Sequence, residues 1–318
     1  MSVAGWRGTL GLVAVAMLLA LLPLVASGYY LQLVSIALMS ACFALSLHLL
    51  VGGVGLVSLG HAAFFGTGAY AVRLLPEGLS ILLTLPAAAL LAAACALPIG
   101  ALSLRTRGFY FLMVTLAFGQ MLFFVFHDTT LSGGKDGVFV TRPALAAFGC
   151  VTEVPRRSRP AAMLWLNLAV LMLVYAGLAA LMRTQFGRAL QGIKANEQRM
   201  LALGYNTQRL KLVAFVLAAA LAGAAGRMWA MTQAFVNPEL LGWHRSAEAL
   251  LMILLGGIGA LHGPILGAFA YVSLEEAATL VTERQRLVEG LVILAAVLLL
   301  PRGLAALRLP GLRRAGVR

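Results

Sequence analysis

The feature that most constrains this sequence is a succession of long apolar runs along almost the whole chain. A membrane-spanning α-helix needs about 20 consecutive, mostly apolar residues to cross the hydrocarbon core. Runs that approach or exceed this length occupy residues 9–26, 29–51, 56–72, 79–103, 109–127, 161–182, 212–235, 247–261, 263–280 and 287–300. The third, eighth and ninth runs are short and rich in glycine. We therefore predict an all-α, polytopic helical membrane protein of about ten transmembrane helices, some of them short or broken.

The composition agrees with a membrane protein and excludes an ordinary soluble enzyme. Hydrophobic residues make up 61% of the chain and charged residues 11%, whereas soluble domains are about 45–50% apolar and about 25% charged. No linker or low-complexity tract divides the sequence, so we predict one transmembrane domain over residues 1–318. Its sizeable water-facing pieces are residues 128–160 and residues 183–211.

The charge balance indicates how the chain is oriented. The formal net charge is +13, and cytoplasmic loops of membrane proteins collect Lys and Arg. An even number of spans places both termini on the same side. Basic residues are more numerous in the segments that become cytoplasmic if both termini are inside. We therefore predict cytoplasmic termini, a periplasmic 128–160 loop and a cytoplasmic 183–211 segment.

Motifs of the common enzymes are missing. The sequence contains neither HExxH nor GxSxG, which are typical of metalloproteases and serine hydrolases. The stretch Gly133-Gly-Lys-Asp136 lacks the Ser or Thr that a phosphate-binding loop needs after its Lys. The three cysteines are scattered and form no cluster with His. The sequence thus predicts no catalytic residues, metal site, cofactor or nucleotide-binding loop.

The 186–204 stretch is predicted to be a short amphipathic helix. On a period of 3.6 residues its apolar side chains gather on one face, with Glu197 in their middle and Arg188 and Arg199 opposite. Gly204 is well placed to end the helix. Such a helix suits docking into a partner's groove or, equally, lying in the lipid interface. The apolar positions are Leu190, Ile193, Met200 and Leu201.

Two glycine-rich stretches carry a second signal. Gly259, Gly263 and Gly267 form overlapping GxxxG steps, which allow close helix packing. The stretch that begins at His262 also resembles the stretch that begins at His61, because each His is followed by small residues and a Tyr at the same offsets. A purely structural interpretation is close helix packing. A functional interpretation is a broken helix that lines a translocation path. In the stretch around His61, the candidates for helix packing or for lining a translocation path are Gly60, His61, Gly66 and Gly68.

Ionisable residues within membrane spans are costly and are candidates for function. Arg227, Glu248, Glu275 and Glu276 lie in predicted spans. In the predicted topology all four fall in the outer halves of their helices. They are expected either to form one charged cluster near the outer mouth or to reach the outer interface separately.

Four blocks of the sequence resemble one protein family. Residues 55–70, Gly-Leu-Val-Ser-Leu-Gly-His-Ala-Ala-Phe-Phe-Gly-Thr-Gly-Ala-Tyr, are similar to a signature of branched-chain amino-acid ABC importer permeases of the LivM type. A second block is residues 105–120, Arg-Thr-Arg-Gly-Phe-Tyr-Phe-Leu-Met-Val-Thr-Leu-Ala-Phe-Gly-Gln. A third, Ser132-Gly-Gly-Lys-Asp-Gly137, departs from the family's Thr-Gly-Gly-x-x-Gly at its first residue. The fourth matches the cytoplasmic coupling block at Phe186-Gly-Arg-Ala-Leu190, Asn196-Glu197 and Ala202-Leu-Gly204.

This resemblance implies the permease subunit of an ATP-driven importer in the bacterial inner membrane. Its implied partners are ABC ATPase subunits, a second homologous permease and a periplasmic substrate-binding protein, and no nucleic acid. It implies that the 186–204 helix docks to an ATPase. The implied coupling residues are Gly187, Arg188, Leu190, Ile193, Glu197, Met200, Leu201 and Gly204.

Two alternatives remain at this stage. Within the family, permeases for urea or short amides have similar blocks. On physical grounds alone, an ion-coupled secondary transporter is also open, although its carboxylates would be expected near the bilayer midplane. The sequence does not give the exact substrate, the residues that contact it, or whether the permease core is a homodimer or a heterodimer.

Overall fold

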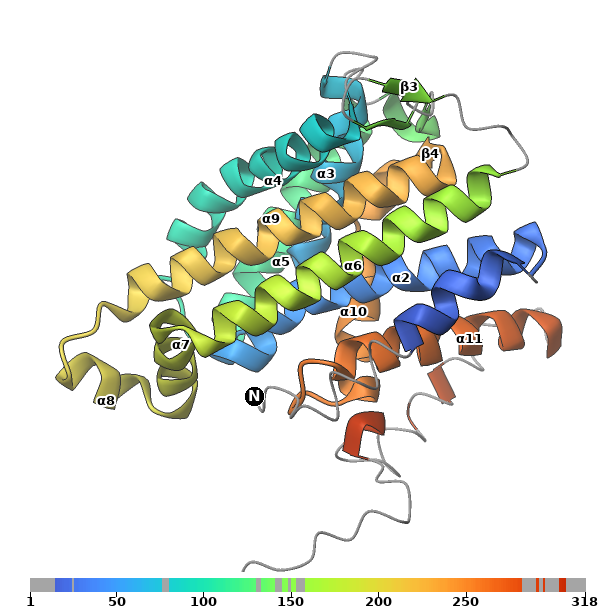
Figure 1. Cartoon of the computed structure of the whole chain (residues 1–318). Helices are drawn as coiled ribbons and strands as arrows, with labels where there is room; N and C mark the ends of the chain where they lie inside the picture. The colour runs from blue at the N-terminus through green and yellow to red at the C-terminus, as the bar shows by residue number, and fades with distance from the viewer. Residues whose placement is uncertain are drawn as a thin grey trace, which may run out of the picture.

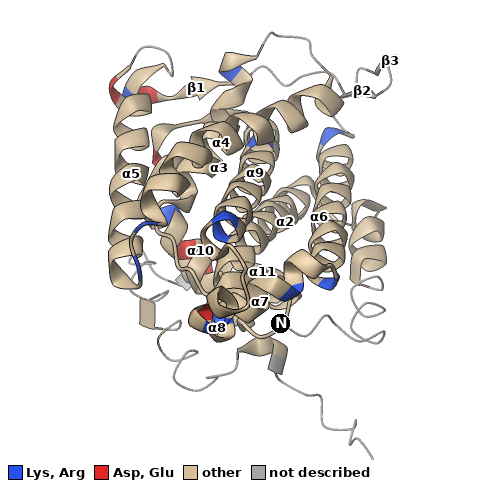
Figure 2. Ribbon diagram, turned by 90° about the vertical axis from the view of Figure 1, so that its left-hand side faces the viewer, with Lys and Arg blue, Asp and Glu red and all other residues tan. Residues whose placement is uncertain are grey.

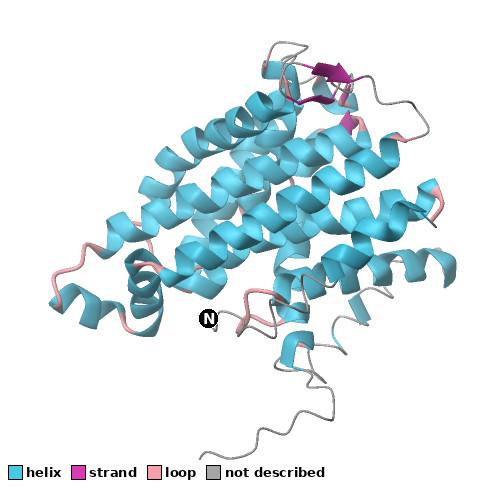
Figure 3. Cartoon of the chain, viewed as in Figure 1, coloured by secondary structure: helices cyan, strands magenta, loops and turns pink. Residues whose placement is uncertain are grey.

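A computed structural model of the chain describes residues 15–24, 26–75, 80–129, 133–140, 145–147, 150–152, 158–281, 290–291, 294 and 303–306. Most of these residues are helical, as Figure 3 shows. The long helices are α2 (Gly28–His48), α4 (Ile81–Ser103), α5 (Phe109–Asp128), α6 (Arg159–Arg183), α9 (Thr207–Gln233) and α11 (Gly263–Val281). The shorter ones are η1 (Leu22–Leu24), η2 (Leu49–Val54), α3 (His61–Leu74), η4 (Gly134–Asp136), α7 (Gln185–Ala195), α8 (Glu197–Ala202), η5 (Pro238–Leu241), α10 (Trp243–Gly256) and η6 (Leu304–Ala306).

Five helices of the described chain are long and apolar enough to cross a membrane. They are α2 with its π-helical extension η2, and α4, α5, α6 and α9. The prediction of a polytopic helical membrane protein is therefore confirmed. The count of about ten spans stays a prediction, because most of the tenth apolar run and part of the first lie outside the described residues.

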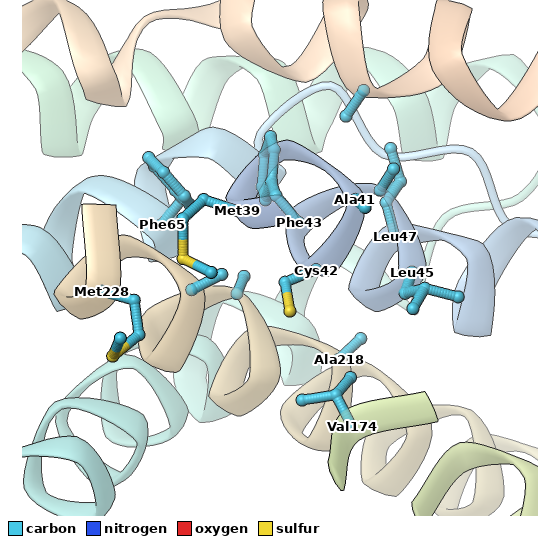
Figure 4. Close-up of a cluster of buried hydrophobic side chains, with 14 of the residues drawn as sticks. Met39, Ala41, Cys42, Phe43, Leu45, Leu47, Phe65, Val174, Ala218 and Met228 are labelled. Atoms are coloured by element: carbon cyan, nitrogen blue, oxygen red, sulfur yellow. The ribbon is translucent and has the colours of Figure 1, made fainter. Parts of the chain in front are cut away.

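Helix α2 forms the centre of the core. Every residue of α2 from Ala37 to His48 is buried. The helix packs against α6, α9 and α11, and Phe43 contacts Phe65 of α3. Figure 4 shows part of this cluster, to which α2 contributes Met39, Cys42 and Phe43, and other helices contribute Phe65, Val174 and Met228. A helix that is apolar on all sides, as α2 is, is expected to be surrounded by other helices.

The water-facing segments lie at opposite ends of the bundle. At one end, strand β1 (Val138–Phe139) pairs with β4 (Phe235–Val236) in an antiparallel register that aligns Val138 with Val236. Strands β2 (Leu145–Ala147) and β3 (Cys150–Thr152) form a second antiparallel pair at this end (Figure 1). Helices α7 and α8 form the other end (Figures 1 and 2). Placing the 128–160 loop opposite the 183–211 segment agrees with the predicted topology.

The third and eighth apolar runs become short helices that do not cross the bundle alone. Helices α3 and α10 have 14 residues each, so at about 1.5 Å per residue they are about 21 Å long, against a hydrocarbon core of about 30 Å. Residues 55–60, between η2 and α3, are not helical. Gly60 packs against Thr115 and Gly119, half-way along α5. Helix α3 therefore begins in the middle of the bundle and not at its end.

Candidate coupling and translocation sites

The 186–204 segment is two helices rather than one. Helix α7 begins after Thr184, whose hydroxyl accepts a hydrogen bond from the Gly187 N–H at 3.3 Å. The chain then turns at Asn196, which has an extended backbone and caps α8 by accepting from the Arg199 N–H at 3.0 Å. Asparagine at this position favours a helix start over a helix interior. The prediction of one continuous helix was wrong for this reason.

The break divides the predicted apolar face. Leu190 and Ile193 of α7 are buried inside this chain, whereas Leu201 of α8 is exposed. Met200 packs back onto Gly192. The face formed by Leu190 and Ile193 is thus occupied by the protein's own core and is not open to a partner.

The end of α8 was predicted correctly. Gly204 has a left-handed backbone, with φ of +83°. Its N–H donates to the Leu201 carbonyl at 2.9 Å, and the Tyr205 N–H donates to the Met200 carbonyl at 3.1 Å. These two bonds form a Schellman motif, which glycine favours because it has no Cβ.

Glu197 has a partner that neither sequence interpretation anticipated. Its carboxylate accepts from Lys211 Nζ at 2.6 Å and from the Thr207 hydroxyl at 3.1 Å, both at the start of α9. Partial burial would raise the pKa of Glu197, but these two hydrogen bonds and the charges of Lys211 and Arg107 outweigh it and hold the pKa below its ordinary value. Glu197 therefore anchors α8 to α9 within the chain. It forms no pair with Lys194, and its carboxylate is not held free for a partner's groove.

Lys194 makes a second internal anchor. Its Nζ donates to the carbonyl oxygens of Val51 at 3.3 Å and of Gly52 at 3.1 Å. These carbonyls belong to η2, which continues α2 to its C-terminal end, where partial negative charge attracts a cation. Partial burial lowers the pKa of Lys194. The α7–α8 segment is thus held to the bundle by one cation and one carboxylate.

A polar pocket lies beside the anchor formed by Glu197 and Lys211. It has a volume of about 470 Å³ and lies between the α4–α5 turn and the start of α9. Lys211 neutralises Glu197 within it, whereas Arg105 and Arg107 have no ion pair among the described residues. The pocket is therefore basic. Its rim carries the exposed apolar side chains of Leu201 and Tyr205.

The two short helices meet in the middle of the bundle. The Ala62 N–H, in the first turn of α3, donates to the hydroxyl of Ser246 in α10 at 2.8 Å. Gly66 lies against Leu241, just before α10 begins. The His61 imidazole lies 2.9 Å from the Ser46 hydroxyl of α2. His61, the first residue of α3, is therefore a buried, hydrogen-bonded histidine in the middle of the bundle.

Most of the candidate glycines lie at close helix contacts. Any side chain on Gly60 or Gly68 would overlap the backbone of Thr115 or Gly223. Gly263 and Gly267 bring α11 equally close to the end of α10, whereas Gly259 has no neighbour within 4 Å. Packing accounts for these positions except Gly259, and a role in lining a path stays a prediction.

The predicted charged cluster around Arg227 is not formed. Glu248 pairs with Arg245 of its own helix at 2.7 Å, and Glu276 accepts a hydrogen bond from the Tyr29 hydroxyl. Arg227 is buried and is not among the ion pairs found in the described part of the chain. Arg245 and Glu248 lie three residues apart on one helix, so their ion pair needs no contact between helices. Glu248 therefore pairs with Arg245 and not with Arg227. Arg245 also stacks on Trp229, with its guanidinium 4.4 Å from the ring centre.

Lys211, Ser246 and Arg245 were missed by the sequence analysis. Lys211 and Ser246 act on residues of other helices, so no helical periodicity marks them. Arg245 was detectable, because Glu248 follows it at helical spacing. No group of three His, Cys, Asp or Glu side chains that could bind a metal occurs in the described part of the chain.

These features define a class of protein. Short helices that end inside a membrane bundle and meet there are typical of membrane transport proteins. Residues 29–299 match the protein family described as "Branched-chain amino acid transport system / permease component". No solved structure matches the chain.

Curated relatives agree with this match. The chain is 31% identical to the high-affinity branched-chain amino acid transport system permease protein LivM of Escherichia coli (strain K12), over 95% of this chain and 76% of the relative. It is 32% identical to LivM of Salmonella typhimurium (strain LT2), over 85% of this chain and 68% of the relative. The high-affinity branched-chain amino acid transport system permease protein LivH of Escherichia coli (strain K12) is 28% identical, over 38% of this chain and 40% of the relative. The chain therefore belongs to the family of permease components of branched-chain amino acid transport systems.

Proposed function

We propose that this chain is a permease subunit of an ATP-driven importer for branched-chain amino acids in the bacterial inner membrane. A periplasmic binding protein would deliver the substrate, and a second homologous permease would complete the pathway. ATPase subunits would dock on α7–α8 and drive the cycle. The family match and the LivM relatives support the substrate class, and the absence of a phosphate-binding loop in this sequence agrees with ATP hydrolysis by another chain.

The observation that carries the docking proposal is the exposed surface of α8 and the turn after it. Leu201, Leu203 and Tyr205 are 42%, 66% and 48% exposed. They surround or adjoin the basic pocket of Arg105 and Arg107. Exposed apolar residues next to polar ones mark protein contact sites. Since Glu197 and Lys194 hold the segment from behind, an ATPase would meet a surface that is already in place.

The docking proposal is tested by purifying the importer with Leu203→Asp. We expect this permease to accumulate in the membrane but to lose its ATPase on purification, because a carboxylate would be buried in the interface without a partner. Phe139→Asp is the matched control, since Phe139 is exposed at the opposite end of the bundle. Retention of the ATPase by both variants would refute docking at α8.

The substrate and the energy source are tested together in proteoliposomes that contain the complete importer. We expect uptake of labelled leucine that requires ATP and the binding protein. Excess valine should compete, and urea or acetamide should not. Competition by urea would indicate the related amide importers. Uptake that follows a proton or sodium gradient without ATP would indicate a secondary transporter.

The orientation is proposed from the charge distribution, with both termini and α7–α8 in the cytoplasm. Cysteine introduced at Phe139 should react with an impermeant maleimide added to intact spheroplasts. Cysteine introduced at Gln198 should react only after permeabilisation. The opposite pattern would invert the topology and remove the docking proposal with it.

The junction of α3 and α10 is the proposed translocation region. Broken helices commonly build transport sites, and their N-terminal ends favour the carboxylate of a substrate. Gly60, Gly66 and Gly68 pack this region closely, so passage of a substrate would require α3 to move relative to its neighbours.

A further inference from the structure

Lys194 connects the surface of the bundle to its middle. Its Nζ donates to the carbonyls of Val51 and Gly52, in the last turn of η2. Because the end of a helix carries partial negative charge, a cation is favoured there. α7 is therefore attached to the C-terminal end of the most deeply buried of the candidate membrane-spanning helices in the described chain.

The contact also includes the stem of the lysine. Gly55 has φ of +84° and ends η2, and a Cβ at Gly55 would lie 3.3 Å from Lys194 Cγ. The lysine stem thus packs on the residue at which the helix stops and the irregular segment of residues 55–60 begins. On the same side of α7, Leu190 and Ile193 are buried. α7 consequently cannot shift without moving either this lysine or the end of η2.

The irregular segment leads directly to the centre of the bundle. Residues 55–60 are too few to take up a large displacement, because a chain of six residues spans at most about 20 Å. Gly60 then packs on α5, and the Ala62 N–H is held by Ser246 of α10 at 2.8 Å. A shift of Gly55 would therefore reach the junction of α3 and α10 within a few residues.

We infer that Lys194 is the positioning residue that transmits movement of α7 to the junction of α3 and α10. This inference rests on the proposed docking of an ATPase at α7–α8. Lys194 contacts neither nucleotide nor substrate in this role. It keeps α7 and the end of η2 moving as one body, so that a displacement of α7 alters the packing of α3 in mid-bundle.

The test compares ATP hydrolysis with leucine uptake by the complete importer in proteoliposomes. Lys194→Met retains the apolar stem over Gly55 but cannot donate to the two carbonyls. We expect the ATPase to stay bound and hydrolysis to change by less than about twofold, while uptake per ATP falls about tenfold (1.4 kcal/mol of lost coupling corresponds to a factor of ten). Lys194→Arg, which keeps the donor and the charge, should restore at least half of the ratio.

Arg73→Met is the matched control. Arg73 is an exposed cation at the far end of α3, and its removal should leave uptake per ATP unchanged. An unchanged ratio in Lys194→Met would overturn the inference, and so would an equal loss of uptake and hydrolysis in the assembled complex. Uptake per ATP is compared only in complexes that retain the ATPase. Whether the ATPase docks at α8 is tested independently by Leu203→Asp, so failure of the docking proposal is distinguished from failure of this inference.

A second measurement, maleimide labelling in the irregular segment, leaves Lys194 unchanged and so does not require a Lys194 variant to fold. Ser58 is buried in the irregular segment, so Ser58→Cys should react slowly with a membrane-permeant maleimide. Trapping the importer with ATP and vanadate should change this rate several-fold if the segment moves with α7. An identical rate in the resting and trapped states would overturn the inference.

Discussion

Two regions of this permease are held together by opposite kinds of contact. In the middle of the bundle, α3 and the glycine before it lie against α9, α5 and η5 through glycines that leave no room for a side chain. At one end, α7 buries Leu190 and Ile193, and two long charged side chains, those of Lys194 and Glu197, bind the α7–α8 segment to the rest of the chain. Close backbone packing tolerates almost no displacement, whereas long side chains can follow a movement. We therefore expect the centre to be disrupted by any added side chain, and the end segment to tolerate the loss of a single contact.

The largest effect is expected from filling the contact between α3 and α9. In Gly226→Val the new side chain would overlap the Phe65 carbonyl of α3, and overpacking costs about 1–3 kcal/mol or more. We expect little monodisperse protein in detergent and a strongly lowered unfolding temperature.

Gly177→Val in α6 is the control for this substitution. Gly177 has no neighbour within 4 Å, and valine is a slightly better helix former than glycine. Its unfolding temperature should match the wild type or exceed it slightly. Equal stability of the two variants would show that the centre is not held by glycine packing.

The next effect concerns the hydroxyl that joins α10 to α3. Ser246→Ala removes the acceptor of the buried Ala62 N–H, and an unsatisfied buried donor costs about 1–3 kcal/mol. We expect a lower unfolding temperature and no change in ATPase retention. Thr279→Ala is the control, because the Thr279 hydroxyl bonds only within its own exposed turn.

A smaller effect is expected at the α8–α9 anchor. The Glu197–Lys211 pair is partly exposed to water, with 26% and 12% of the two side chains accessible, and pairs of this kind contribute about 0.2–1 kcal/mol. Glu197→Gln and Lys211→Met should each speed tryptic cleavage after Arg199 in inside-out vesicles. The double variant should be cleaved no faster than the worse single variant, because both changes remove one interaction. Additive rates would show that the two residues do not hold α8 together.

The smallest effect is the pH dependence of the same anchor. The pKa of Glu197 is lowered in the folded chain, so its contribution to stability is present above the ordinary carboxyl pKa. That contribution is lost as the pH falls through the lowered value. Hydrogen exchange in α8, corrected for the intrinsic rate, should be flat from pH 7 to 5 and should rise only in stronger acid. Glu197→Gln should abolish this rise.

The sequence alone determined the features that depend on local chemistry and on the length of apolar runs. The apolar runs predicted the helices of a polytopic membrane protein, and the short glycine-rich runs at 56–72 and 247–261 indicated helices that do not cross alone. Gly204 ended its helix as predicted, because a left-handed turn concerns only the residues beside it. The four sequence blocks indicated the family that the comparisons confirmed.

Only the tertiary structure decided which distant residues meet. The carboxylate of Glu197 is bound by Lys211, fourteen positions away, because the turn at Asn196 points α8 toward α9. Glu248 is held by Arg245, so Arg227 does not gather the carboxylates that the sequence assigned to it. Lys194 binds the carbonyls of Val51 and Gly52, which lie 143 and 142 positions earlier in the chain. Helical periodicity predicts which face of a helix a residue occupies, but it does not predict which other helix packs on that face.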